Sequence, residues 1–312
     1  MVSDVKIQFS DLEGWIKEDH SAAFDVFSRT SSLINGFDKN TEQSVLKKEI
    51  SPKVFFEKTF NPILINSPKS VLFTGYYEPE INGSLVKDDE FKFPIYRKPK
   101  ELNTKKKWFS RRDIEEKNIL KGKNLEIVFL RTALEVFLLQ VQGSGRIILR
   151  DRSILRVGYD CKNGHDYVSI GKVLVGRGVF STNTISHQAL KNWITTNPNE
   201  GNELLYENPS YVFFKVVPDL SPLSGPIGTA KTPLESFRSI AIDPLHIPLG
   251  SPTWIEKKGH PLLKKIMIAQ DTGSAIIGPA RADIYCGAGE KAEEIAGNIN
   301  ELGSMIVFKI RD

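Results

Sequence analysis

Two aspartates near the C-terminus are the residues of this chain with the clearest potential for chemistry. They lie in the segment AQDTGSAIIGPARADIY, where Asp271 opens the tetrapeptide Asp-Thr-Gly-Ser and Asp283 follows twelve residues later. Two carboxyl groups whose surroundings separate their pKa values can share acid and base work on a glycosidic bond. The same tetrapeptide marks the catalytic turn of aspartic proteases, and an aspartate can also bind only the backbone amides of its own turn. The spacing alone leaves these three interpretations open.

The copy number of the tetrapeptide argues against a protease. Aspartic proteases bring two Asp-Thr-Gly turns together so that two carboxyls share one proton. This chain has one copy, which starts at residue 271 of 312, and Gln270 precedes it where the protease turn has an apolar residue. Too little sequence follows to complete a protease lobe, and a dimeric protease would leave most of the chain without a role.

The remaining chemistry is that of one carboxylic acid that acts first as an acid and then as a base. Asp283 lies in a segment rich in Ala, Ile and Tyr, where partial burial is expected to raise its pKa. A nearby Asp271 would raise that pKa further, or would hold a turn. Arg281, two residues before Asp283, is expected to lower it.

Other common chemistries lack their motifs. The stretch GSGRII (143–148) has neither the third glycine nor the following helix of a phosphate loop, and QGSGR is no nucleophile elbow for the same lack of a helix. The five histidines show no paired metal spacing, so neither a metal nor a cofactor is expected. Cys161 and Cys286 are far apart and are interpreted as free thiols.

Composition is that of an ordinary globular protein. The chain has 40% hydrophobic and 26% charged residues and a formal net charge of +4, and its two short basic runs, at 97–100 and 104–112, are typical of a solvated face. Nothing here predicts nucleic-acid binding. No apolar run is long enough to span a bilayer. Residues 1–15 contain no apolar signal core, so we expect a secretory signal either to be absent or to have been removed.

The coarse pattern is mainly β with N-terminal helices. The first forty residues have helical periodicity, 70–81 and 208–217 are typical of strands, and 125–150 is interpreted as ending in two strands joined by a tight turn at Gly-Ser-Gly. Residues 218–233 are rich in Pro, Gly and Ser and are expected to form a linker or long loop. Short strands with turns, and one helix at 289–300, follow. Many short strands favour a β-barrel.

Taken together, the motifs resemble the membrane-bound lytic transglycosylase A (MltA) family of bacterial murein-cleaving enzymes. They occur in order from about residue 71 to the C-terminus. The stretches are FTGYYEPEI, FPIYRKP, VQGSGRI, CKNGHDYVSIGKVL, NPSYVFFK, AIDPLHIPLG, AQDTGSAI and ADIYCGAGEKAEEIAG.

The resemblance implies a two-domain fold. A double-psi β-barrel, formed by residues 1–77 and 219–312 together with the N-terminal helices, would be the catalytic domain. A second β-rich domain, 78–218, would be inserted into it, with a large groove between the two. The C-terminal part resembles the three-aspartate domain of that family.

The resemblance also implies roles for individual residues. Asp283 matches the family's catalytic acid, and Asp271 and Asp243 match the two supporting aspartates. The substrate-binding positions that the resemblance implies are Thr74, Tyr76, Gln142, Gly143 and Ser144. Tyr76 is expected either to stack on a sugar ring or to alternate with Tyr77 across a strand as a packing residue. His165 and Lys172 also match, either as site residues or as stabilisers of the insertion.

The implied reaction is cleavage of the β-1,4 bond between N-acetylmuramic acid and N-acetylglucosamine with formation of a 1,6-anhydro sugar, one aspartate serving as acid and base. The alternatives are a catalytically inactive glycan-binding module on the same fold and a hydrolytic glycosidase. The implied partner is the peptidoglycan glycan strand, with cell-wall synthesis proteins as further candidates. We expect a monomer in the periplasm, associated with the outer membrane if an anchor exists.

Overall fold

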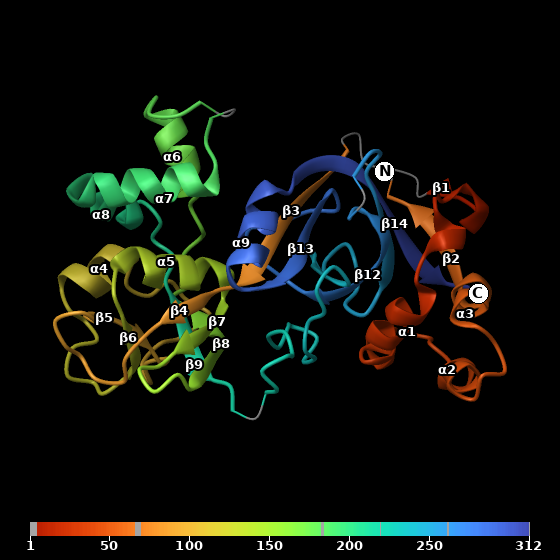
Figure 1. The fold of residues 1–312 in the computed structure, drawn as a ribbon, viewed down its shortest axis with the longest axis horizontal. Coiled ribbons are helices and arrows are strands. Elements are labelled where there is room, and N and C mark those ends of the chain that lie inside the picture. Colours follow the sequence, from red (N-terminus) through yellow and green to blue (C-terminus); the bar gives the residue numbers. More distant parts are fainter. Residues whose placement is uncertain (1–4, 66–69, 182–183, 219, 261, 312) are drawn as a thin grey trace. The chain divides into compact units, whose positions relative to one another are not determined.

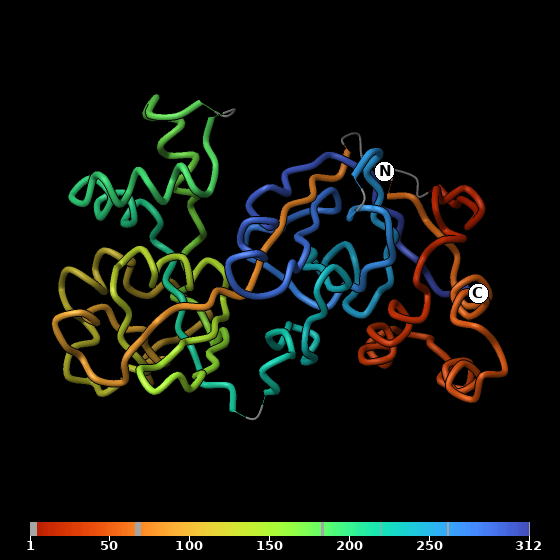
Figure 2. Tube along the Cα trace, in the orientation of Figure 1, coloured from red at the N-terminus to blue at the C-terminus, as the bar shows by residue number. Residues whose placement is uncertain are grey.

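The computed structural model describes residues 5–65, 70–181, 184–218, 220–260 and 262–311. The chain divides into two compact units (Figures 1 and 2). Unit 1 comprises residues 1–77, 224–287 and 294–312, and unit 2 comprises 78–223 and 288–293. Among the described residues, no helix combines the length and the apolar character needed to cross a membrane.

Unit 1 is built on a closed six-stranded barrel. Its strands follow the order β14–β11–β12–β10–β13–β3, and a further pairing between β14 and β3 closes the ring. The strands are β3 (Val71–Glu78), β10 (Ser239–Ala241), β11 (Pro252–Glu256), β12 (Lys264–Asp271), β13 (Arg281–Ala288) and β14 (Asn300–Ile310). Segments on both sides of unit 2 in the sequence therefore supply barrel strands. Two further strands, β1 (Val5–Lys6) and β2 (Phe60–Leu64), extend the sheet beyond β14.

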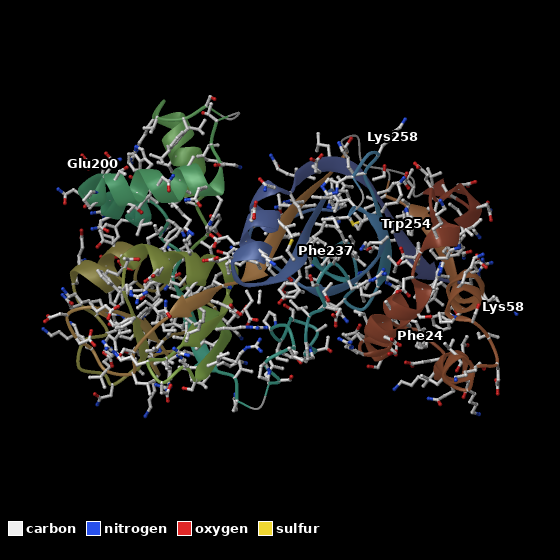
Figure 3. The ribbon with its side chains drawn as sticks, in the orientation of Figure 1. Phe24, Lys58, Glu200, Phe237, Trp254 and Lys258 are labelled. Carbon is white, nitrogen blue, oxygen red and sulfur yellow. The ribbon has the colours of Figure 1, made fainter. Side chains whose placement is uncertain are left out.

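Helices from the N-terminal segment cover one side of this barrel. They are α1 (His20–Ser28), α2 (Lys39–Leu46) and α3 (Pro52–Thr59). Each begins at a side-chain cap, for example at Ser51, which accepts a hydrogen bond from the Val54 amide. Aromatic side chains of α1 and α3 form one core with barrel residues. Phe24 of α1 and Trp254 of β11 belong to this core and are labelled in Figure 3.

The helical pattern at 10–16 is the exception in this segment. The sequence places Leu12, Trp15 and Ile16 on one helical face, but the chain makes only short 3-10 turns there. Leu12 and Trp15 are buried, whereas Ile16 is 84% exposed. Packing of Trp15 against aromatic neighbours such as Phe9 and Phe308 fixes these turns without a regular helix.

Unit 2 combines sheets and helices. A four-stranded sheet has the order β4–β7–β8–β9, and β5 pairs with β6. The strands are β4 (Glu80–Asn82), β5 (Phe93–Tyr96), β6 (Glu126–Leu130), β7 (Ser144–Ile148), β8 (Ile154–Lys162) and β9 (Val212–Val216). The helices are α4 (Arg111–Glu116), α5 (Ala133–Gln142), α6 (Ile170–Gly176), α7 (His187–Thr196) and α8 (Pro198–Tyr206). The sequence pattern alone underestimates this helical content.

The clearest error concerns the segment before Gly-Ser-Gly, which is helix α5 and not a strand. Thr132 and Glu135 form a capping box that starts the helix, and Gly143 ends it with a φ of 78°. A run of apolar residues fits a buried helix as well as a buried strand, and here the cap residues decide. The hairpin partner of β7 is β8, and the turn between them lies at 149–153.

The motif CKNGHDY lies among loops of unit 2. Asn163 is fully buried, and its amide group donates to the carbonyls of Phe109 and Pro209. His165 contacts the Trp108 carbonyl through Nε2, 2.8 Å away. These bonds tie three loops of unit 2 together, so the contacts of His165 are those of a stabilising residue.

Candidate active site

Strand β3 presents two polar side chains on one face of the barrel wall. Thr74 and Tyr76 are two residues apart, so they project to the same side, whereas Gly75 between them projects to the other. A Cβ atom at Gly75 would lie 2.7 Å from the Ala296 Cα of helix α9 (Gly289–Asn298) and 3.0 Å from the Cys286 sulfur. The glycine in FTGYY therefore lets β3 pack closely against α9 and Cys286.

The strand register brings the two aspartates to positions around one small residue. Ala241 on β10 is the register partner of Asp283 on β13 and also of Asp271 on β12. Register partners project from the same face of a sheet. Ala241 is buried and has a small side chain, so it leaves room between the two aspartates for their carboxyl groups.

Asp283 has few protein partners. Thr74 donates a short hydrogen bond from its hydroxyl to Oδ1 of Asp283, and the Arg281 guanidinium donates to the same Thr74 oxygen at 2.7 Å. Burial raises the pKa of Asp283. The hydrogen bond from Thr74 and the charge of Arg281 lower this pKa, whereas the charge of Asp271 raises it. The net direction is upward. The lowering expected from Arg281 is therefore present but is outweighed by burial.

Asp271 is surrounded by donors. Its Oδ1 accepts from the amide and the hydroxyl of Thr229, each at 3.0 Å, and its Oδ2 accepts from the Tyr76 hydroxyl at 3.0 Å. Burial raises the pKa of Asp271, and the net direction is upward here too. Hydrogen bonds from the Thr229 and Thr272 amides, from Tyr76 and from the Thr229 hydroxyl oppose the rise. Each of these donors stabilises the carboxylate, and Asp283 has one such donor. When two carboxyls share a site, this difference favours Asp271 as the anion and Asp283 as the proton holder.

Asp243 binds backbone amides of two loops. Its Oδ1 accepts from the Leu245 amide and its Oδ2 from the Gly278 amide, at 3.0 and 2.7 Å. These two bonds lower the pKa of Asp243, so it is ionised. The carboxylate thereby fastens the loop after β10 to the loop before β13.

The predicted ligands Gln142, Gly143 and Ser144 belong to unit 2. They form the last residue of α5, its left-handed cap and the first residue of β7, and all three are half-buried. Their role as substrate ligands stays a prediction.

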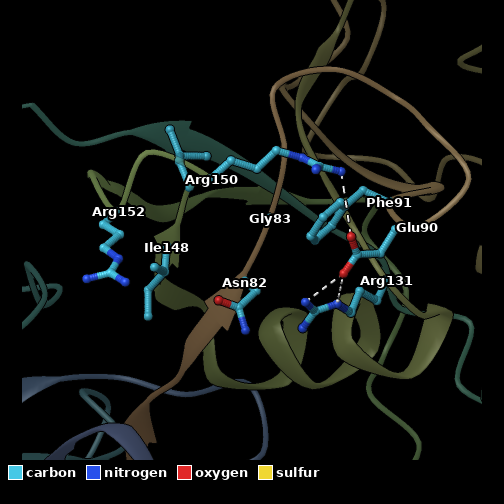
Figure 4. Close-up of a pocket in the computed structure, with 9 residues that line it drawn as sticks. Asn82, Gly83, Glu90, Phe91, Arg131, Ile148, Arg150 and Arg152 are labelled. Carbon is cyan, nitrogen blue, oxygen red and sulfur yellow. Dashed lines mark hydrogen bonds and ion pairs between the residues drawn. The ribbon is translucent and has the colours of Figure 1, made fainter.

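A cavity of about 440 Å³ lies elsewhere in unit 2 (Figure 4). Arg131, Arg150, Arg152 and Phe91 contribute to its lining, and none of the predicted site residues does. Arg131 is paired with Glu90, and both Arg131 and Arg150 lie over the Phe91 ring. The guanidinium groups of these two residues are therefore engaged within the unit.

Sequence reasoning missed two residues of the site. Thr229 lies in the segment interpreted as a linker, where a threonine among Gly and Ala carries no signal of its bonds to Asp271. Ala241 matters only through its register, which the sequence does not reveal. The charge of Arg281 is visible in the sequence, but its hydrogen bond to Thr74 is not. Within the described residues, no cluster of three or more metal-ligating side chains occurs.

Comparisons with known proteins agree with this arrangement. A family profile described as MltA specific insert domain matches residues 72–215, and one described as 3D domain matches 238–309. A membrane-bound lytic murein transglycosylase A homolog of Buchnera aphidicola is 31% identical over 91% of this chain and 78% of its own length. The membrane-bound lytic murein transglycosylase A of Escherichia coli K12 is 37% identical over 77% of this chain and 66% of its own length.

Solved structures show the same fold. A membrane-bound lytic murein transglycosylase from Agrobacterium tumefaciens superposes with a TM-score of 0.86 at 32% identity, covering 99% of this chain and 98% of its own. The structure of E. coli MltA with bound chitohexaose gives a TM-score of 0.78 at 28% identity, covering 100% of this chain and 92% of its own. The chain therefore belongs to the MltA family of peptidoglycan lytic transglycosylases, with a C-terminal 3D domain.

Proposed function

We propose that this protein cleaves the β-1,4 bond between N-acetylmuramic acid and N-acetylglucosamine in peptidoglycan and leaves a 1,6-anhydromuramic acid end, with Asp283 as the single acid and base. The observation that carries the proposal is the inequality of the two carboxyls. Burial raises the pKa of both carboxyls, but Asp271 accepts hydrogen bonds from several donors, whereas Asp283 accepts from the Thr74 hydroxyl. A carboxyl that keeps its proton near neutral pH is what a general acid requires.

The mechanism needs one proton to leave and one to return. Asp283 donates its proton to the oxygen between the two sugars, the C1–O bond breaks, and positive charge develops at C1 of the muramic acid. Asp283 is then a carboxylate, and it accepts the proton of the C6 hydroxyl of the same sugar as that oxygen bonds to C1. The proton count on Asp283 is restored, and water takes no part.

Asp271 and Asp243 support this chemistry from fixed positions. An ionised Asp271 favours the protonated form of Asp283, since two adjacent negative charges repel. General acid–base work contributes about a hundredfold to ten-thousandfold. The remaining acceleration must come from holding the C6 hydroxyl close to C1 in a distorted sugar.

The wider assignments follow from family membership. The structure of E. coli MltA with bound chitohexaose supports a glycan strand as the ligand here. We assign Gln142, Gly143 and Ser144 to glycan binding in a groove, the barrel to the double-psi class, and residues 78–218 to an inserted substrate domain. The names of the relatives support a periplasmic, membrane-associated location. A monomer without a cofactor, working alongside cell-wall synthesis proteins, completes the assignment.

Digestion of purified murein tests the proposal. The expected products are anhydromuropeptides, which are lighter by one water than the products of a hydrolase and lack a reducing end, and mass spectrometry distinguishes the two. Reducing-end muropeptides would show a hydrolytic glycosidase. Binding to murein without any released product would show an inactive glycan-binding module, and either result would overturn the proposal.

A further inference from the structure

A chain of two hydrogen bonds links Arg281, Thr74 and Asp283. Arg281 donates from one terminal nitrogen to the Thr74 hydroxyl oxygen, and Thr74 donates to Oδ1 of Asp283. The other terminal nitrogen of Arg281 donates to the carbonyls of Leu72 and Ala282, at 3.2 and 3.0 Å. The guanidinium is thus fixed by the main chain of two adjacent barrel strands. Within the described residues it forms no direct ion pair with Asp283.

Proton counting sets the direction of this chain. A guanidinium carries only donors, and a threonine hydroxyl has a single hydrogen. Because Thr74 accepts from Arg281, its one hydrogen is free to point at Asp283. While Thr74 donates to Oδ1 of Asp283, that oxygen is an acceptor, and a proton on this carboxyl is placed on the other oxygen, Oδ2.

We infer that Arg281 is a positioning residue that orients the Thr74 hydroxyl, and that this orientation assigns the transferable proton of Asp283 to Oδ2. The inference rests on the proposed function, since it states which oxygen of the acid faces the reacting bond. It makes Thr74 a partner of the acid and not a ligand of the sugar. A hydroxyl held in this direction also stabilises the carboxylate that forms after the first proton transfer.

The arrangement balances two opposing effects on Asp283. Burial favours the neutral acid, whereas the oriented hydroxyl and the nearby positive charge favour the anion. A residue that must be an acid in one step and a base in the next requires that both forms be accessible. Without the oriented hydroxyl, burial would act unopposed by a hydrogen bond, and the second step would slow.

The test measures the titration of Asp283 directly in the folded protein without substrate, by the carboxyl 13C signal of labelled aspartate in NMR, with assignment from Asp283→Asn. We expect Thr74→Val to raise the pKa of Asp283, because it removes the hydroxyl and keeps the shape. Thr74→Ser, which keeps the hydroxyl, is expected to titrate like the parent protein. Thr253→Val is the matched control, since Thr253 donates to the Met267 carbonyl elsewhere in the same barrel.

Arg281 variants separate positioning from structure. Arg281→Met is expected to raise the pKa of Asp283 in the parent background by more than in the Thr74→Val background, because part of its effect passes through Thr74. Arg281→Lys keeps a side chain that can only donate, and the pKa of Asp283 in this variant is expected to lie between that of the parent protein and that of Arg281→Met. On murein, Thr74→Val and Arg281→Met are expected to lower kcat roughly tenfold to a hundredfold with little change in KM, the loss of one hydrogen bond to a charged group.

Two results would overturn the inference: equal pKa shifts from Arg281→Met in both backgrounds, or no shift in either. If Arg281→Met fails to fold, the same comparison is made with Arg281→Lys. Absence of anhydro products with the titration pattern intact would reject the proposed function and leave the positioning role standing. Anhydro products, together with equal pKa shifts from Arg281→Met in both backgrounds, would support the proposed function and reject the positioning role of Arg281.

Discussion

One buried carboxyl, Glu78, and one half-buried carboxyl, Asp283, have opposite surroundings in this molecule. Glu78 of unit 2 is 1% exposed, and Arg156 binds both of its oxygens at 2.7 and 2.9 Å while Arg146 binds one at 2.9 Å. Asp283 of unit 1 accepts from a hydroxyl, and Arg281, the cation beside it, binds that hydroxyl instead of the carboxyl. Glu78 is therefore neutralised by direct contact and Asp283 is not.

The difference separates a carboxyl that holds a structure from one that can exchange a proton. A carboxylate that binds two guanidinium groups directly holds together the segments that carry them. A carboxyl bonded to a neutral hydroxyl can exist in either form at modest cost. The arginine near Asp283 tunes this balance without abolishing it.

Replacement of Asp283 and of Glu78 by their amides should change the free energy of unfolding in opposite directions. The largest effect of all is expected on the activity of Asp283→Asn. Asp283→Asn removes the acid, and murein cleavage should fall by at least about a hundredfold. The free energy of unfolding at neutral pH should rise, because the amide carries no charge to bury. Product release and urea unfolding measure the two quantities. An active Asp283→Asn variant would remove Asp283 from the mechanism.

The pH dependence of stability gives the same comparison without activity. The folded-state pKa of Asp283 is above its unfolded value, so its contribution is fully present below the unfolded pKa and is lost as pH rises through the folded pKa. The parent protein should therefore gain more stability than Asp283→Asn as pH is lowered through this window. Parallel curves for the two proteins would contradict a raised pKa.

Glu78→Gln should destabilise unit 2 strongly, by about 3–5 kcal/mol, because it leaves two arginines short of their shared partner. Urea unfolding followed by circular dichroism measures the change. Glu80→Gln is the matched control: Glu80 also pairs with Arg146, but its side chain is 39% exposed, and the expected change is below about 1 kcal/mol. A Glu78→Gln variant as stable as its parent would end the contrast with Asp283.

Asp271→Asn should shift the activity profile and not abolish it. The negative charge of Asp271 raises the pKa of Asp283, so its removal should lower that pKa. The alkaline limb of kcat against pH should then move to lower pH, since the acid loses its proton earlier. A limb that stays in place would show that the charge of Asp271 is not felt by Asp283.

The smallest effect is expected for Tyr76→Phe. It removes one donor from Asp271 and should cost roughly 1–2 kcal/mol in unfolding free energy. It should also raise the pKa of Asp271, which the Tyr76 bond lowers. Tyr159→Phe, at a position that is 49% exposed, is the control and should be near neutral. Loss of glycan binding with unchanged stability would instead indicate that the Tyr76 hydroxyl bonds the glycan, because phenylalanine keeps the ring.

Much of the fold could be predicted because its signals are local. The strands around FTGYYEPEI and YVFFKVV and the helix at 289–298 follow from their residue patterns. The error at α5 has a local cause, because an apolar run fits two periodicities and only its cap residues, Thr132 and Glu135, distinguish them. At 10–16 in unit 1, by contrast, aromatic packing around Trp15 overrides a helical pattern.

The sequence by itself determined which residues were available for chemistry: a lone Asp-Thr-Gly turn, a second aspartate in an apolar segment, and a threonine and tyrosine on one strand face. Only the tertiary structure decided which of them contact one another. The barrel register places Ala241 opposite both aspartates, and contacts between Thr74, Asp283 and Arg281 span more than two hundred residues of chain. The physical reason is that a pKa depends on the solvent, donors and charges around a group, and folding alone assembles these from distant segments.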